Sequence, residues 1–278
     1  MWCAHQRRWA NAWQSCSANQ PLPPGRPAAV VRLPIMSTFQ FQQFSVAQAH
    51  SAMKVCTDAT LFGAMAPVQK DDRVLDIGAG TGLLSLMLAQ LGAGSVTGVE
   101  LTKEAFDECR DNFRNSPWAG RLQAVHQDIR EFAAGNPTRY DLIISNPPFF
   151  TDHTRTADPL RATARHTDQL PYQQLLAIAA ELIDAQGRLY LLLPSHAVAA
   201  IIKQAACHQL YLVGRTDLRG HAYKQAKVSA LLFSHTANPY VARLLTIYRA
   251  ERDYSAASSA YLSPFLLRFA QANFKIED

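Results

Sequence analysis

Four short apolar runs in this sequence lead into residues that can bind or act on a ligand. The run Arg73–Ile77 contains Asp76 and precedes three glycines, and the second run ends at Glu100. Asp128 follows the third run, and the fourth leads into Asn146-Pro147-Pro148-Phe149. Ligands of open parallel sheets bind beyond the carboxyl ends of the strands, so these groups predict one shared site.

The first group is a glycine-rich turn formed by Gly78, Gly80 and Gly82. Glycine lets a ligand approach backbone that a side chain would otherwise cover. Turns of this kind also bind NAD or FAD, or only allow a helix to pack closely on a strand. A dinucleotide-binding turn has a third glycine at the position that Leu83 occupies here, which counts against NAD.

The next group consists of two acids at strand ends. Glu100 lies eighteen residues after Gly82 and suits a carboxylate that holds both hydroxyls of a ribose. Asp128 suits an acceptor for the exocyclic amine of adenine, and the neighbouring Leu101 and Ile129 are predicted to contact the same cofactor. Either acid alone could be a solvated loop carboxylate. Together they predict a nucleoside site without a pyrophosphate, as S-adenosylmethionine requires.

The sharpest feature is the turn Asn146-Pro147-Pro148-Phe149. Proline fixes φ and lacks an N–H, so the turn is stiff and its carbonyls are free to face a ligand. The amide oxygen of Asn146 and the carbonyl of Pro147 can converge on one NH2 group and orient its lone pair. Phe149 offers a flat face for a planar base. The alternative is a turn that merely ends a strand, with Phe149 in the core.

Alternating strands and helices must position these groups. We expect a doubly wound, mostly parallel α/β sheet with right-handed crossovers and an antiparallel hairpin at one edge. The predicted strands are 73–77, 95–99, 122–126, 140–145 and 188–193, with the hairpin at 210–216 and 227–235. The predicted helices are 83–91, 103–115 and 171–184.

Composition limits the remaining possibilities. The chain has 278 residues, 48% of them hydrophobic and 18% charged, which suits one large domain with a real core. The sequence has no apolar run long enough to span a membrane, and its five scattered cysteines indicate reduced thiols in a cytoplasmic protein without a metal site.

The first 35 residues differ from the rest. They hold four arginines, three of the four tryptophans and no acid, and without them the net charge falls from +5 to +1. We predict that residues 1–35 are a disordered extension, translated upstream of a true start at Met36, and that 36–278 form one domain. A transit peptide is the alternative.

The segments Asp76–Gly82 and Asn146–Phe149 resemble the class I S-adenosylmethionine-dependent amino-methyltransferases. More narrowly, the chain is similar to the bacterial tRNA1(Val) adenine-N6 methyltransferase family from about Phe39 to Phe269. The segments that carry this resemblance are 39–46, 52–58, 61–64, 116–118, 141–149 and 164–166. Ala59, Met65 and Phe149 depart from the family pattern.

The resemblance implies a Rossmann-like fold and methylation of N6 of adenine 37 in the tRNA anticodon loop. Separately, we expect a monomer rather than an obligate oligomer. The resemblance also implies that the segment with Lys54, Thr57 and Asp58 folds over the mouth of the site, where Asp58 binds cofactor and Lys54 and Pro148 bind substrate. Thr57 or Asp58 could instead cap a helix.

Basic residues are the candidates for contacts with RNA phosphates. The first predicted cluster follows the proline turn and consists of Arg155, Arg161, Arg165 and His166. The second lies near the hairpin and consists of Lys203, Arg215, Arg219, Lys224 and Lys227. Either cluster could be an ordinary solvated face.

Four alternatives remain open. The same turn could methylate a glutamine amide of a peptide release factor, although the stretch before the first core strand is short for that family's helical domain. Methylation of ribosomal RNA or DNA is the second alternative. An NAD(P)-dependent oxidoreductase and a non-catalytic RNA-binding module are the others.

Overall fold

The computed structural model describes residues 38–51, 53–148 and 170–274, the last four without their side chains. All of them belong to the unit Met36–Asp278. The predicted extension 1–35 and the start at Met36 lie outside the described residues and stay predictions.

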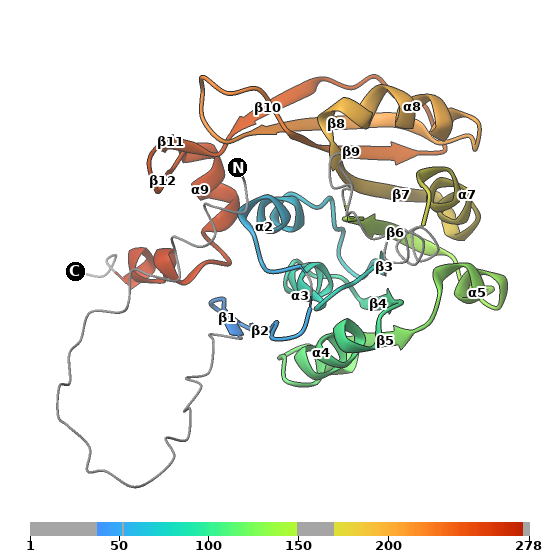
Figure 1. Ribbon diagram of the computed structural model, residues 1–278, viewed down its shortest axis with the longest axis horizontal. Helices are drawn as coiled ribbons and strands as arrows, with labels where there is room; N and C mark the ends of the chain where they lie inside the picture. The colour runs from blue at the N-terminus through green and yellow to red at the C-terminus, as the bar shows by residue number, and fades with distance from the viewer. Residues whose placement is uncertain (1–37, 52, 149–169, 275–278) are drawn as a thin grey trace, which may run out of the picture. The chain divides into compact units, whose positions relative to one another are not determined.

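Within the described residues, eight strands form one sheet, shown in Figure 1. Five neighbouring strands are parallel, whereas β9 runs antiparallel to both β7 and β8. In spatial order the strands are β10 (Ala242–Thr246), β8 (Tyr211–Arg219), β9 (Val228–Ser234), β7 (Ile183–Pro194), β6 (Tyr140–Ser145), β3 (Arg73–Ile77), β4 (Ser95–Glu100) and β5 (Leu122–His126). The predicted fold class is confirmed, and the sheet extends one strand beyond the predicted hairpin, because β10 pairs in parallel with β8.

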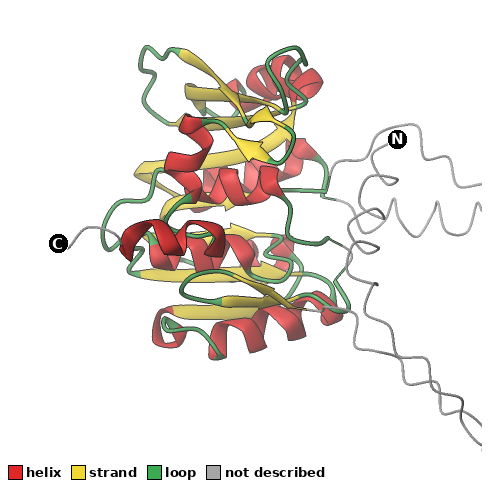
Figure 2. Cartoon of the chain, turned by 90° about the vertical axis from the view of Figure 1, so that its left-hand side faces the viewer, coloured by secondary structure: helices red, strands yellow, loops and turns green. Residues whose placement is uncertain are grey.

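Helices cover both faces of this sheet. One face packs against α2 (Thr57–Ala64), α3 (Leu83–Gln90), α4 (Lys103–Arg114) and α9 (Ala256–Leu262). The other face packs against α5 (Ile129–Ala134), α7 (Tyr172–Leu182) and α8 (Val198–Ala206). Figure 2 shows helices of the first face lying in front of the strands.

The strand sequences explain the two layers. Successive side chains of a strand point to opposite faces, so a strand that is apolar throughout fills two cores. In β3, Val74 packs on the α3 side and Leu75 on the α7 side, and both are buried. Asp76 follows the same alternation and is fully buried on the α3 side, where Ser85 contacts it.

Short elements complete the described chain. They are β1 (Thr38–Gln40), β2 (Ser45–Ala47), β11 (Tyr248–Ala250), β12 (Asp253–Tyr254) and the 3-10 helices at Ala119–Arg121, Ser195–Ala197 and Leu267–Phe274. Strands β1 and β2 form an antiparallel hairpin, and α9 lies beside α2 (Figure 1). No helix among the described residues is both long and apolar enough to cross a membrane.

Candidate active site

The register of the parallel strands brings the four predicted groups to one edge of the sheet. Asp76 of β3 is paired with Ile144 of β6, so the glycine turn and Asn146 start at the same level. On the other side, β4 is paired with β3 up to Val99 and with β5 at Glu100. The predicted shared site therefore lies at the carboxyl edge of β6, β3, β4 and β5.

The glycine turn has the backbone conformation that glycine permits. Gly78, Gly80 and Gly82 have φ values of 73°, 57° and 81°, in the left-handed region. The N–H groups of Gly78 and Ala79 donate to the carbonyl of Val99 at 2.9 and 3.1 Å, which fixes the turn against β4. A Cβ added at Gly78 or Gly80 would meet nothing within 4 Å. The turn therefore has open space beside it for a ligand.

Gly82 serves packing as well as conformation. A Cβ at this position would lie 2.5 Å from Cε1 of Phe113 and 3.0 Å from Sγ of Cys109, both buried residues of α4. The close approach of the turn to α4 therefore requires glycine here.

We expect Gly82→Ala to lower the free energy of unfolding by about 2–3 kcal/mol, because backbone strain and overlap with Phe113 add. Gly78→Ala, at a similar φ but facing open space, should cost only about 1–2 kcal/mol. Urea denaturation of both variants measures the difference. Equal losses of unfolding free energy in the two variants would mean that overlap with Phe113 does not affect stability.

Asp76 is a buried acid with an unpartnered oxygen. Its Oδ2 accepts a hydrogen bond from Oγ of Ser85 at 2.7 Å, and its Oδ1 accepts none from the described residues. Burial raises the pKa of Asp76 to about 7, with a smaller contribution from the charge of Glu100. The free oxygen can accept a hydrogen bond from a donor on a bound cofactor.

This raised pKa predicts how stability depends on pH. The folded state holds the proton up to about pH 7 and the unfolded state releases it near pH 4, so this group destabilises the fold as pH rises between these values. The slope is at most about 1.4 kcal/mol per pH unit, and it ends above pH 7. We expect the stability advantage of wild type over Asp76→Asn to shrink from pH 4.5 to 7 in denaturation curves without cofactor. A constant difference would contradict the raised pKa.

Glu100 is tied to the glycine turn. Its Oε2 accepts the N–H of Gly80 at 2.9 Å, and its Oε1 accepts the N–H and the hydroxyl of Thr102, each at 2.9 Å. The side chain is thus held beside the open part of the turn. Leu101 is exposed, with its carbonyl 3.1 Å from Nε2 of His126. Thr102, which helps to orient Glu100, was not among the residues predicted from the sequence.

Asp128 is the N-cap of α5. Its Oδ1 accepts the backbone N–H and Nε of Arg130, each at 2.8 Å, and Oδ2 pairs with the same guanidinium. Hydrogen bonding to Arg130 lowers the pKa of the Asp128 carboxyl. Asp128 thus lies at the predicted edge with its charge already paired, and its role toward adenine stays a prediction. Ile129, the next residue, is buried.

Asn146 has a polar atom without a hydrogen-bond partner among the described residues. Its Oδ1 is buried and accepts no hydrogen bond from the described residues. The residue before it is anchored, because Oγ of Ser145 donates to the carbonyl of Ile77 at 2.7 Å. Pro147 is half-buried and Pro148 is exposed. An orphaned buried acceptor is costly unless a ligand supplies the donor, so Asn146 fits a residue that binds an amine. Phe149 lies outside the described residues.

The segment before the first core strand is held over α4. Glu108 accepts the N–H groups of His50 and Ser51 at 2.7 and 3.0 Å. Asn112 bonds both backbone polar groups of Ala47 at 2.8 and 3.0 Å and donates to the carbonyl of Thr81, in the glycine turn, at 2.9 Å. Sequence reasoning missed these two buried polar residues, whose signal was their place on the apolar face of an amphipathic helix.

The residues at and just before the start of α2 include three for which the sequence predicted a role. Lys54 donates to the carbonyls of Gln48 and Ala49, and thus closes its own loop. Cys56 is the N-cap of α2 and has no side-chain cap, so the alternative that Thr57 or Asp58 caps this helix is wrong. Burial raises the pKa of the Asp58 carboxyl, and the charge of Lys227 partly opposes this rise.

The structure separates the second predicted basic cluster. Lys203 lies in the last turn of α8, and Arg215 pairs with Asp217 within β8. Arg219 is the last residue of β8, where its Nε donates to Oγ1 of Thr246, and Lys224 and Lys227 follow in the β8–β9 turn. The first predicted cluster lies outside the described residues: Arg155, Arg161, Arg165 and His166.

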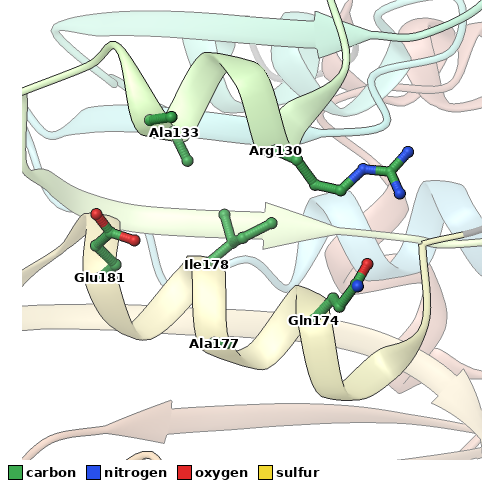
Figure 3. Close-up of a pocket in the computed structure, with 7 residues that line it drawn as sticks. Arg130, Ala133, Gln174, Ala177, Ile178 and Glu181 are labelled. Carbon is green, nitrogen blue, oxygen red and sulfur yellow. The ribbon is translucent and has the colours of Figure 1, made fainter.

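A hollow of about 360 Å³ lies away from these groups, between α5 and α7 (Figure 3). Arg130 and Gln174 line one end and Glu181 the other. Apart from Arg130, the partner of Asp128, it involves no residue that contacts the predicted site. The described residues also contain no group of three or more His, Cys, Asp or Glu side chains that could hold a metal.

Comparisons with known proteins agree with this arrangement. Residues 44–215 match the family described as Methyltransferase small domain. The tRNA1(Val) (adenine(37)-N6)-methyltransferase of Edwardsiella ictaluri is 38% identical over 88% of this chain and 100% of its own length. The protein of the same name from Cronobacter sakazakii is 41% identical over 82% of this chain and 94% of its own length.

The fold also matches a solved structure. The crystal structure of a predicted O-methyltransferase from Agrobacterium tumefaciens superimposes with a TM-score of 0.58, covering 73% of this chain and 94% of that one. The two are 17% identical, so this likeness shows the fold alone.

Proposed function

The chain belongs to the tRNA1(Val) (adenine(37)-N6)-methyltransferase family, and from this we propose that it transfers a methyl group from S-adenosylmethionine to N6 of adenine 37 in tRNA1(Val). The observation that carries the proposal is the buried Oδ1 of Asn146, which has no hydrogen-bond partner among the described residues and lies at the end of β6, the strand next to the open glycine turn. A monomer acting in the cytoplasm, as expected from the sequence, is part of the same proposal.

The residues at the strand ends fit S-adenosylmethionine. Open space beside Gly78 and Gly80 admits a ligand close to the backbone, and Glu100 stands next to it as an acceptor for ribose hydroxyls. Oδ1 of Asp76, which accepts no hydrogen bond within the described part of the chain, is an acceptor for the cofactor's donors. The bound cofactor supplies an electrophilic methyl group on a sulfonium.

The chain's own contribution is to hold and polarise the amine. The amino group of adenine is a poor nucleophile because its lone pair is delocalised into the ring. The amide oxygen of Asn146 and the carbonyl of Pro147 accept its two N–H bonds and stabilise the positive charge that develops on nitrogen during attack. Much of the acceleration then comes from positioning, after the base has left the anticodon-loop stack. Phe149 is the proposed cover for the ring.

Methylation of a glutamine amide is the strongest rival, since it needs the same pair of acceptors. The relatives named above match this chain over 94–100% of their own length and are named for a tRNA adenine, which supports the RNA substrate. The test is to incubate the protein with cofactor carrying a 13C methyl group, together with total tRNA, ribosomal RNA and release factor.

Mass spectrometry of the digested products decides between the substrates. We expect labelled N6-methyladenosine in the tRNA fraction. Label on a glutamine peptide or on ribosomal RNA alone would move the function to one of those rivals.

A further inference from the structure

The β8–β9 turn carries an exposed aromatic side chain in a basic setting. Tyr223 is 81% exposed, and its ring stacks on that of His221 with centroids 5.4 Å apart and planes 10° apart. Nζ of Lys224 lies 5.7 Å from the centre of the Tyr223 ring. The sequence has no acid between Asp217 and Glu251. An exposed ring among cations suits a partner that has both flat bases and negative charge.

A row of aromatic rings lies behind Tyr223 and supports it. His221 lies 5.6 Å from Tyr248, which stacks on Tyr254 at 5.2 Å. The hydroxyl of Tyr248 is 3.0 Å from Oγ1 of Thr57, which connects the row to α2. Backbone hydrogen bonds fix the turn itself. The N–H of Tyr248 donates to the carbonyl of Gly220, and the N–H of Lys227 donates to the carbonyl of Leu218. Tyr223 is therefore presented by an ordered support.

The topology puts this support on the edge of the sheet that holds the active site. Strand β9 runs antiparallel to β7, so Val228, its first residue, pairs with Pro194 at the carboxyl end of β7. The N–H of Ser195 donates to the carbonyl of Lys227 at 2.9 Å, so the β8–β9 turn adjoins that end. Strand β8 is three strand spacings from β6, which is about 14 Å. A few nucleotides of single-stranded RNA can span this distance.

We propose that Tyr223, backed by His221 and flanked by Lys224 and Lys227, is a stacking site for a second, unpaired base of the RNA whose target adenine enters beside Asn146. The proposal rests on the proposed function for the identity of the RNA. An exposed π-face binds any base, whereas the lysines contact phosphates without reading sequence. The site thus positions the loop while Asn146 selects the amine.

The test measures binding of an anticodon stem-loop RNA by fluorescence anisotropy at several salt concentrations. We expect Tyr223→Ala to raise Kd about tenfold at every salt concentration, and Tyr223→Phe to stay within about twofold of wild type, because the ring is kept. Stacking releases no counterions, so the salt dependence should not change in either variant. Lys227→Ala should instead reduce the slope of log Kd against log salt by about one.

Tyr211→Ala is the matched control. Tyr211 is also an exposed tyrosine, at the start of β8 and so at the opposite edge of the sheet, and its loss should leave Kd unchanged. Equal affinity of wild type and Tyr223→Ala, or equal loss in the alanine and phenylalanine variants, would overturn the stacking site. Wild-type protein that binds no loop RNA would overturn it too. Wild type that binds the RNA but does not methylate it would overturn the proposed function alone.

Discussion

Replacing Asn146 with alanine is expected to lower kcat for adenine methylation about a thousandfold, while the Kd for S-adenosylmethionine changes less than about twofold. Oδ1 of Asn146 is buried and accepts no hydrogen bond from the described residues, and in the proposed function it bonds the substrate amine. This bond should strengthen as the nitrogen becomes positive. Removing one preorganised partner of a developing charge costs two to three orders of magnitude in enzymes that use such groups.

Single-turnover kinetics with saturating tRNA and calorimetric titration of the cofactor separate the two quantities. Asn238→Ala is a suitable control, because Asn238 is exposed in the loop between β9 and β10, at the opposite edge of the sheet. If cofactor affinity fell together with kcat, Asn146 would be part of the cofactor site or of the turn's folding, and its assignment to the amine would be wrong.

Replacing Glu100 with alanine is expected to weaken S-adenosylmethionine binding about a hundredfold. The variant loses the proposed bonds to the ribose, and it also releases Gly80 and Thr102, whose N–H groups the carboxylate now accepts. Hydrogen bonds to a charged group contribute about 1.5–3 kcal/mol, and a hundredfold change in Kd is about 2.7 kcal/mol.

Isothermal titration of the purified protein measures this effect. Glu104→Ala is the matched control, since Glu104 is exposed in the first turn of α4 and makes no contact with the glycine turn. A Glu100→Ala protein that kept wild-type affinity would remove Glu100 from the cofactor site.

The sequence predicted the strands and the edge at which they end, because both depend on local patterns. Apolar runs such as Arg73–Ile77 and Tyr140–Ser145 have the length of buried strands, and the structure gives them these bounds. Once the strands are parallel and adjacent, their carboxyl ends must meet. The convergence of Asp76, Glu100 and Asn146 follows from that rule alone.

Other features depend on contacts between residues far apart in the chain. Glu108 and Asn112 stand out on the apolar face of α4, but they bind backbone groups 57 to 65 residues earlier, and no local pattern identifies those groups. The basic cluster at 203–227 looked continuous in sequence, yet Lys203 is on a helix that runs back from the active edge. The row of rings behind Tyr223 joins Thr57 to Tyr248, across 191 residues.

Asp128 shows a different limit. Its position after β5 was predictable, but no sequence pattern indicated that Arg130 would pair with it and lower the pKa of its carboxyl. A carboxylate shortly after β5 can serve either as a helix cap or as an acceptor for adenine. The local pattern therefore could not separate these two roles.

The central claim is that Asn146 and Pro147 together hold the amine of adenine beside the glycine turn. A crystal structure of the protein with S-adenosylhomocysteine and an anticodon stem-loop RNA tests it most directly. The amide oxygen of Asn146 and the carbonyl oxygen of Pro147 should each lie about 3 Å from N6 of one flipped-out adenine. An adenine bound elsewhere, or an Asn146 amide turned into the packed interior with no base beside it, would contradict the claim.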